Sequence, residues 1–340
     1  MQSSQQFDDR RRGAEARRIA LSIIIVNWNS KDYLLKALAA IDAEREDSER
    51  EIIVIDSGSF DGSGEVVRQQ YPKVSFIQSE ENLGFAKANN QAFKTSRGET
   101  ILFLNPDTEV QDDAVDQLTV HLTTSPEIGI VGPKLLNTDR SIQEVCIRAF
   151  PTMLNQILDS DILKKLFPKA GLWGMKNLND KAAGRVEAVS GACLMIRRKV
   201  FEQVGMFSQD YFMYSEDMDL CFKAKQAGFQ THYVPSAVVV HHGGSSSSRA
   251  AVSAFASVMM LESRWKFFRR TRSPTYAAIY RVAMFAASII RIGLSLCAWP
   301  VLLLLGKGYR SEAALQKWYA GLRWTLGMER WVKKYETRSS

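Results

Sequence analysis

The 340-residue chain contains little cysteine and little histidine, with four of each. No two cysteines form a CxxC pair, and a chain of this length can bury a hydrophobic core without cross-links. A disulfide framework is therefore not expected, and a reducing compartment fits this composition better. Two of the four histidines, His241 and His242, are adjacent, which makes that pair a candidate functional site.

The N-terminus lacks the apolar core of a signal peptide, because residues 1–20 are mostly polar and charged. We expect this segment to be a disordered tail. A dinucleotide-binding motif is also absent, since Gly58, Gly62 and Gly64 do not have GxGxxG spacing. A sugar nucleotidyltransferase would need a glycine-rich basic loop to hold a triphosphate, and residues 27–33 hold one lysine and no glycine. Both classes of protein are disfavoured.

Long charge-free apolar runs are missing too. Residues 277–305 are largely apolar but contain Arg281 and Arg291. The longest uninterrupted stretch, 292–306, has 15 residues and includes Pro300. About 20 residues are needed to span a bilayer, so we expect this segment to lie at a membrane interface rather than to cross it.

Basic residues and tryptophans are concentrated near the C-terminus. The net charge is +7, but residues 261–340 alone carry 15 Lys+Arg and 4 Asp+Glu, so the rest of the chain is weakly acidic. Five of the seven tryptophans lie in the same region. This pattern favours an anionic membrane surface over nucleic acid as the partner. We expect residues 251–340 to form a helical membrane-proximal region; the alternative is a helical hairpin packed on the protein or in a homo-oligomer contact.

The remainder of the sequence alternates strand-like and helix-like segments. Continuous apolar, β-branched runs predict buried strands at 21–26, 51–55, 74–78, 100–104, 128–132, 186–196 and 231–240. Amphipathic segments predict helices at 32–41, 63–70, 86–95 and 215–227. This rhythm predicts a doubly wound α/β domain over residues 21–250, with a mainly parallel sheet covered by helices on both faces.

Ligands of open α/β sheets bind beyond the carboxyl ends of the strands. In this sequence the loops there are rich in Asn, Asp, Ser and Gly, namely 27–30, 56–63, 80–89 and 105–109. Asp56 in DSGSFDGS can accept hydrogen bonds from a base or a ribose, and the NLGFAKANN segment can meet an anion or a base. The alternatives are an Asx turn with a helix cap and a simple helix start.

Two further clusters carry carboxylates. Asp107 in NPDTE follows a strand and can hold Mg²⁺ or Mn²⁺, and the histidine pair can complete that metal site; a proline turn is the alternative. Glu216, Asp217 and Asp219 crowd a helix start, where the helix dipole accounts for one or two of them. The third carboxylate is a candidate for a catalytic base. Position alone does not separate Glu216 from Asp217, and Asp219 is expected to cap or pair locally.

Seven segments, in this order and spacing, resemble the family 2 glycosyltransferases, and most of all their bacterial rhamnosyltransferase-like branch. The resemblance covers about residues 21–245 and rests on SIIIVNWNS, VIDSGSFDGS, NLGFAKANNQAF, FLNPDTEV, SGACLMIRR, FMYSEDMDLCFKAKQAGF and HHGGSS. It implies a GT-A, Rossmann-like catalytic domain that moves a sugar from a nucleotide diphosphate to a polysaccharide or lipid-linked acceptor with inversion. Rhamnose is a candidate sugar, and the implied place of action is the cytoplasmic face of the cell membrane.

The resemblance also assigns residues. It implies that Asp217 is the general base, and that Asp107 is the metal carboxylate with His242 nearby. Glu216, which has the longer side chain, is expected to bind hydroxyls of the acceptor. The expected donor pocket contains Asn27, Asn29, Asp56, Ser57, Asn82, Gly84, Phe85, Asn89 and Asn105. The QxxRW signature of processive synthases is absent, because Leu261 stands where Gln would, which predicts single sugar addition. The alternative is a catalytically inactive GT-A-like protein that binds membranes.

Overall fold

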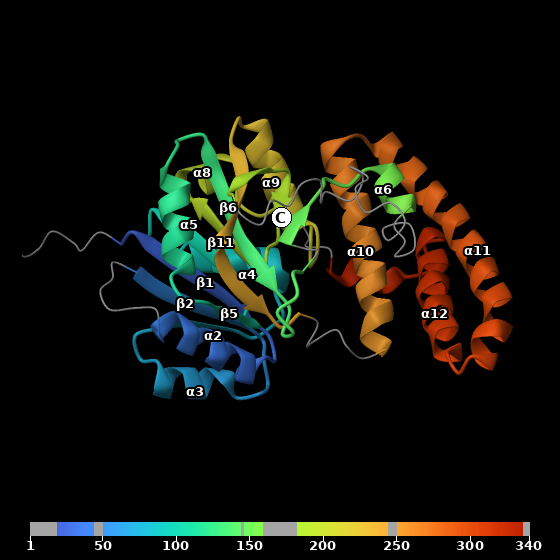
Figure 1. The fold of residues 1–340 in the computed structure, drawn as a ribbon, viewed down its shortest axis with the longest axis horizontal. Helices are drawn as coiled ribbons and strands as arrows, with labels where there is room; N and C mark the ends of the chain where they lie inside the picture. The colour runs from blue at the N-terminus through green and yellow to red at the C-terminus, as the bar shows by residue number, and fades with distance from the viewer. Residues whose placement is uncertain (1–18, 44–49, 144–145, 159–181, 244–249, 336–340) are drawn as a thin grey trace, which may run out of the picture.

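The computed structural model describes residues 19–43, 50–143, 146–158, 182–243 and 250–335 (Figure 1). The expected disordered tail falls almost entirely on residues 1–18, which lie outside the described residues.

Nine strands of the described residues form one mixed sheet in the order β3-β2-β1-β4-β10-β6-β11-β5, with β8 paired to β11. The strands are β1 (Leu21–Asn27), β2 (Arg50–Ser57), β3 (Ser75–Ser79), β4 (Thr100–Leu104), β5 (Thr108–Val110), β6 (Ile128–Leu136), β8 (Gly184–Val186), β10 (Cys193–Arg197) and β11 (Gln230–His241). The first four strands in this order are parallel, and β10 runs antiparallel between β4 and β6. A separate pair consists of β7 (Ile147–Arg148) and β9 (Ala188–Val189).

Alternate residues of the central strands bury opposite faces of the sheet. Ile24 of β1 joins the core with Phe103, whereas Ile23 and Ile25 join the core on the other side. The first core contains α4 (Gly84–Phe93), α8 (Arg198–Gln203) and α9 (Glu216–Gln226). The second contains α2 (Lys31–Ala43), α3 (Ser63–Gln70) and α5 (Ala114–Thr123). The predicted α/β domain with helices on both faces is thereby confirmed.

Several segments differ from the sequence prediction. The single strand expected at 186–196 is broken into β8, β9 and β10, because a bend at Glu187 separates β8 from β9 and a turn at Ser190–Ala192 separates β9 from β10, which runs antiparallel to β4. The strands β5 and β7 and the helices α5 and α8 were not predicted. Strand β5 has three residues and pairs only at the sheet edge with β11, so its sequence gives almost no periodic signal.

The C-terminal region is helical, as expected. It contains α10 (Ala250–Thr271), α11 (Pro274–Leu304), α12 (Gly308–Thr325) and the 3₁₀ helix η2 (Arg330–Tyr335), with the short α6 (Met153–Ile157) beside α11 (Figure 1). These helices share a core with the sheet domain. Phe267 of α10 packs edge-on against Phe222 of α9, and the hydroxyl of Ser263 donates to the carbonyl oxygen of Met213. The region is therefore attached to the face of the domain that α9 covers.

Helix α11 is long and apolar. It has 31 residues, and its most apolar stretch of 18 residues has a mean hydropathy of 1.9. Only 11% of that stretch is buried inside the protein, so by length and composition the helix could cross a membrane. The two arginines that interrupt the apolar run point inward. Arg281 donates to the carbonyl oxygens of Thr325 and Trp324, and Arg291 donates to that of Ile157. The outer face of the helix consequently lacks their charges.

The start of α4 requires glycine. Gly84 has a φ of +71°, and an added Cβ would lie 2.4 Å from the carbonyl oxygen of Phe212. That same carbonyl accepts a hydrogen bond from the Phe85 N–H at 3.0 Å, so it cannot move away without loss. Gly62 has a similar φ of +75° but no atom within 4 Å of such a Cβ.

These two glycines provide a matched test of backbone strain against steric contact. Gly62→Ala should cost roughly 1–2 kcal/mol of unfolding free energy for the left-handed conformation alone. Gly84→Ala should cost roughly 1–3 kcal/mol more, because the methyl group overpacks against Phe212. Urea titrations of both variants measure the difference. Equal losses would show that the contact with Phe212 does not constrain α4.

Candidate active site

A buried carboxylate joins the ends of three parallel strands. Asp56, at the end of β2, accepts a hydrogen bond from the Asn27 side chain at 2.8 Å and from the Ser63 hydroxyl at 3.0 Å. Its other oxygen accepts from the Ser59 N–H at 2.8 Å and from the Gln78 side chain at 2.7 Å. The residue is 1% exposed. The loops after β1, β2 and β3 are therefore held together around one negative charge.

Burial by itself would raise the pKa of Asp56, but hydrogen bonds from Ser59, Asn27 and Gln78 outweigh it and lower the pKa below its usual value. Of these donors, Gln78 is exposed. Its amide is the donor that a ligand from outside could replace.

Most of the other residues predicted for the donor pocket lie in the same loops. The Asn29 N–H donates to the Ser59 hydroxyl, and the Asn29 side chain accepts from the Phe60 N–H. Ser57 accepts from the Leu83 N–H at 2.7 Å. Two more pairs close the turn into α4, with the Gly84 N–H donating to Asn82 and the Asn89 side chain donating to the Phe85 carbonyl oxygen. The sequence clusters thus form one connected wall.

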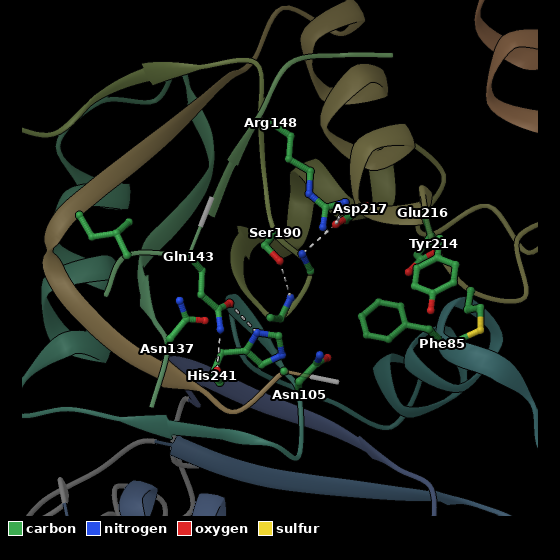
Figure 2. Close-up of a pocket in the computed structure, with 15 residues that line it drawn as sticks. Phe85, Asn105, Asn137, Gln143, Arg148, Ser190, Tyr214, Glu216, Asp217 and His241 are labelled. Carbon is green, nitrogen blue, oxygen red and sulfur yellow. Dashed lines mark hydrogen bonds and ion pairs between the residues drawn. The ribbon is translucent and has the colours of Figure 1, made fainter. Parts of the chain in front are cut away.

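A cavity of about 650 Å³ lies next to this wall (Figure 2). This volume suits a ligand of nucleotide-sugar size. Of the predicted site residues, Phe85, Asn105, Glu216 and Asp217 line it. The predicted residues Asn27, Asn29, Asp56, Ser57, Asn82, Gly84, Asn89, Asp107 and His242 are not part of its lining. The site thus has a loop half around Asp56 and a cavity half around the carboxylates.

Asp217 is held in one orientation at the cavity wall. One carboxylate oxygen accepts from the Gly191 N–H at 3.0 Å and lies 3.8 Å from the Arg148 guanidinium, and the other accepts from the Met218 N–H at 2.8 Å. Figure 2 shows Arg148 and Asp217 facing each other across the upper part of the cavity. These contacts come from β7, the turn before β10, and α9, so the side chain is fixed before any ligand binds.

Glu216 has a different environment. Burial, followed by the charge of Asp217, raises the pKa of Glu216 to about 8. One of its carboxyl oxygens is buried and has no hydrogen-bond partner among the described residues. Burial, followed by the charge of Glu216, also raises the pKa of Tyr214, which lines the cavity. At neutral pH Glu216 is therefore largely protonated and can donate a hydrogen bond to a ligand.

Asp219 pairs locally, as the sequence predicted, and does not line the cavity. It accepts hydrogen bonds from the hydroxyls of Ser208 and Tyr211 and lies within 3.5 Å of the Lys223 ammonium and 3.7 Å of Arg270. This buried cluster connects α9 to the preceding loop and to α10.

The carboxylate of Asp107 faces His241 rather than His242. His241 Nε2 lies 3.4 Å from Asp107 Oδ1. His242 instead bonds Glu109 at 2.7 Å, and its ring packs on Tyr33 with centroids 5.1 Å apart. The structure thus brings the His241 ring, rather than that of the predicted ligand His242, to the Asp107 carboxylate, because successive residues at a strand end point to opposite faces.

The donor set around Asp107 fits a divalent cation. A carboxylate oxygen and an imidazole nitrogen face each other at the cavity edge. The carboxylate is a ligand type for both Mg²⁺ and Mn²⁺, whereas the imidazole nitrogen is a ligand of transition-metal ions and favours Mn²⁺. Among the described residues there is no group of three or more such side chains. Most coordination positions of a bound cation would therefore be filled by oxygen atoms that do not come from these two side chains.

Several cavity residues were not predicted from the sequence, namely Asn137, Gln143, Arg148, Ser190 and Tyr214. Ser190 lies within the quoted SGACLMIRR segment and Tyr214 within the quoted FMYSEDMDLCFKAKQAGF segment, so both had a local signal. Arg148 and Gln143 lie in a stretch without a recognisable pattern. They reach the cavity only because β7 and the segment after β6 are folded over it.

The comparisons with known proteins agree with this geometry. Residues 22–205, more than half of the chain, match the family model described as Glycosyl transferase family 2. N-acetylglucosaminyl-diphospho-decaprenol L-rhamnosyltransferase of Mycobacterium tuberculosis is 29% identical over 251 residues, which cover 70% of this chain and 80% of the relative. Rhamnosyltransferase WbbL of Escherichia coli is 30% identical over 225 residues, which cover 63% of this chain and 80% of the relative.

The fold is similar to that of a solved glycosyltransferase. The mannosyltransferase PcManGT from Pyrobaculum calidifontis, in complex with GDP-Man and Mn²⁺, superposes with a TM-score of 0.56 at 18% identity, covering 93% of this chain and 88% of that one. This similarity shows the fold, which is GT-A.

The raised pKa of Glu216 has a consequence for stability. The unfolded chain loses the Glu216 proton near pH 4.5, whereas the folded chain keeps it to about pH 8, so this residue lowers the unfolding free energy as pH rises between these values. The Glu216→Gln variant has no carboxyl group to titrate at this position, so it does not lose this unfolding free energy as the pH rises. The melting temperature of the variant minus that of the wild type should therefore be more positive at pH 8 than at pH 5.

Circular-dichroism melts at several pH values measure this difference. Glu81→Gln, which removes a carboxylate whose side chain is 76% exposed, is the control and should change stability little at every pH. A Glu216→Gln offset that stays constant from pH 5 to pH 8 would contradict the assignment.

Proposed function

The chain belongs to glycosyl transferase family 2, and we propose that it transfers one sugar, with inversion, from a nucleotide diphosphate to a glycan or lipid-linked acceptor of the cell envelope. One observation carries this proposal. Glu216 and Asp217 line the same cavity as Asn105, at the end of β4 and beside the Asp56 loops. Rhamnose is our candidate sugar, because the two relatives compared above are named as rhamnosyltransferases.

The loop half of the site would bind the nucleoside. Asp56 is buried behind Gln78, whose exposed amide occupies one carboxylate oxygen. We propose that the N–H of a uracil or thymine ring replaces this amide, so that one hydrogen bond is exchanged for another. Asn27, with its own side-chain oxygen buried and without a partner among the described residues, holds the other Asp56 oxygen in place.

Asp107 and His241 would hold a divalent cation, Mg²⁺ or Mn²⁺. When bound, this cation would neutralise negative charge on the leaving nucleoside diphosphate. The main chain supports the pair, because the His242 N–H donates to the carbonyl oxygen of Asp107 at 2.9 Å. The end of β11 is thereby fixed to the loop after β4.

Asp217 is the proposed general base. A base must be in its carboxylate form, and Glu216, with its pKa of about 8, is mostly protonated at neutral pH. Asp217 would take the proton of the acceptor hydroxyl while that oxygen attacks the anomeric carbon and the bond to the diphosphate oxygen breaks. A single displacement of this kind inverts the anomeric centre. Glu216 would donate a hydrogen bond to the acceptor.

Helix α11 would place the enzyme on a membrane. Its exposed face forms an apolar stripe at helical spacing that includes Ile279, Val282, Ile290, Leu294, Val301 and Leu304. Exposed Lys307 and Arg310 follow at the turn into α12, where they would meet anionic headgroups. The opposite face, with Tyr280 and Met284, is buried against the neighbouring helices. We propose that the hairpin of α11 and α12 lies on the cytoplasmic surface of the membrane with the exposed apolar face of α11 inserted. If α11 spanned the membrane, the contacts of Tyr280 and Met284 with the neighbouring helices would be lost.

Variants of the acidic cluster test the chemistry. Asp217→Asn should reduce sugar transfer by about 10²–10⁴-fold while donor affinity persists, because only the proton acceptor is lost. Glu216→Gln should retain transfer. Wild-type transfer should decline above about pH 8 as Glu216 loses its proton, and this decline should vanish in Glu216→Gln. Transfer from uridine and thymidine diphosphate sugars, with donor affinity measured by calorimetry, provides the readouts.

Two results would contradict the proposal. If transfer rises through pH 8 and Glu216→Gln is the inactive variant, the base is Glu216. If the wild type with divalent cation neither transfers sugar nor hydrolyses any donor, the inactive, membrane-binding alternative holds.

Vesicle flotation tests the membrane face. Ile290→Glu with Leu294→Glu should weaken binding to vesicles containing phosphatidylglycerol at least tenfold, because each apolar side chain contributes about 1.5–3 kcal/mol when buried. Val120→Glu is the control, since Val120 is 65% exposed on α5 at the other end of the molecule (Figure 1). Equal flotation of both variants would refute the assignment. A dimer held by α11, without flotation, would support the oligomer alternative.

A further inference from the structure

The His241 ring is held by a single side chain through two hydrogen bonds. Gln143 Nε2 donates to the main-chain carbonyl oxygen of His241 at 2.6 Å, and Gln143 Oε1 lies 2.9 Å from His241 Nδ1 (Figure 2). Gln143 contacts the backbone and the ring of the same residue. Both the position and the rotation of the ring are therefore fixed.

These two contacts determine where the ring proton lies. A carbonyl oxygen only accepts, so the Gln143 amide must direct its NH₂ toward the His241 main chain. The amide oxygen then faces Nδ1, and this contact is a hydrogen bond only if Nδ1 carries a proton. Neutral His241 is consequently held as the Nδ1–H tautomer, and Nε2 presents a lone pair.

The lone pair of Nε2 meets a second acceptor. Asp107 Oδ1 lies 3.4 Å away, which is longer than the 2.7–3.2 Å of N–H···O hydrogen bonds. A lone pair and a carboxylate oxygen repel each other unless a positive charge lies near both. Neutral imidazole nitrogen is the form that binds metal ions, and its other nitrogen commonly donates to a second group that orients it.

Gln143 is itself rigid. It is 8% exposed, its N–H donates to the Leu135 carbonyl oxygen at 2.9 Å, and its own carbonyl oxygen accepts from the Cys146 N–H at 3.1 Å. His242 has no such arrangement, because its Nε2 is bonded to Glu109. The structure therefore distinguishes two histidines that are equivalent in the sequence.

We propose that Gln143 is a positioning residue that locks His241 in the Nδ1–H tautomer, so that His241 Nε2 and Asp107 together face a divalent cation. This inference rests on the proposed metal-assisted transfer, but it concerns a proton position that can be observed without any sugar donor.

Nitrogen-15 NMR of histidine-labelled protein tests the proton position directly. The chain has only four histidines, and loss of signals in His241→Asn identifies the ring. At pH 8 without metal, wild-type His241 should show a protonated Nδ1 and an unprotonated Nε2. In Gln143→Leu, the Nε2–H tautomer should become populated. A wild-type ring with the proton on Nε2, or with both nitrogens protonated, would overturn the proposal.

Metal affinity provides the second measurement. By electron paramagnetic resonance titration with Mn²⁺ alone, Gln143→Leu should bind about 10–100-fold more weakly than the wild type. Gln143→Glu retains an acceptor for the Nδ1 proton and should recover part of the affinity. Gln111→Leu is the control, because Gln111 bonds the carbonyl oxygens of Glu109 and Val110 at the same sheet edge and should leave affinity unchanged.

The outcomes separate this inference from the proposed function. Equal Mn²⁺ affinity of Gln143→Leu and the wild type would overturn the inference even if the enzyme transfers sugar. The Nδ1–H tautomer together with weakened Mn²⁺ binding in Gln143→Leu would support it even if no sugar transfer is found.

Discussion

The arrangement of the loops around Asp56 depends on one buried negative charge. Parallel strands β1, β2 and β3 end at the same edge, and each sends a polar loop over it. Without a common partner these loops would be separate, solvated turns. Asp56 supplies that partner by accepting from Asn27 at the end of β1, from Ser59 in the loop after β2 and from Gln78 of β3. Because burial opposes its ionisation, the carboxylate is stable only while those donors remain in place. The donors in and beside the loops keep Asp56 ionised, and the ionised Asp56 in turn holds those loops together.

The cavity side depends on a reversal in the sheet. Strand β10 enters antiparallel beside β4, so the turn before it lies at the carboxyl end of β4, where the Asn105 N–H donates to the Ala192 carbonyl oxygen. The same turn directs the Gly191 N–H to Asp217 at the start of α9. An added Cβ on Gly191 would lie 3.2 Å from the Asp217 side chain, which explains the small residue at this position. A doubly wound sheet of parallel strands alone would not bring the acidic start of α9 to the loops that follow the parallel strands.

Patterns within one segment predicted much of this molecule. The apolar runs at β1, β2 and β4 are buried on both faces and could be located from sequence, as could the polar loops that follow them. Arg148 could not be, since its proximity to Asp217 requires β7 to pair with β9, and each of these strands has two residues. Tertiary pairing of such short strands leaves no periodic signal.

The remaining differences between the sequence prediction and the structure concern the direction in which side chains point. His241 and His242 were found as a pair, but a strand sends neighbours to opposite faces, and only the packing against Gln143 and Glu109 shows which one meets Asp107. The same reasoning applies to α11. Counted along the chain, Arg281 and Arg291 interrupt an apolar run, yet on the helix both point toward the protein and bond carbonyl oxygens. A charge limits membrane contact only when it faces the lipid. The outer surface of α11 is therefore continuously apolar, although two arginines interrupt the apolar run in the sequence.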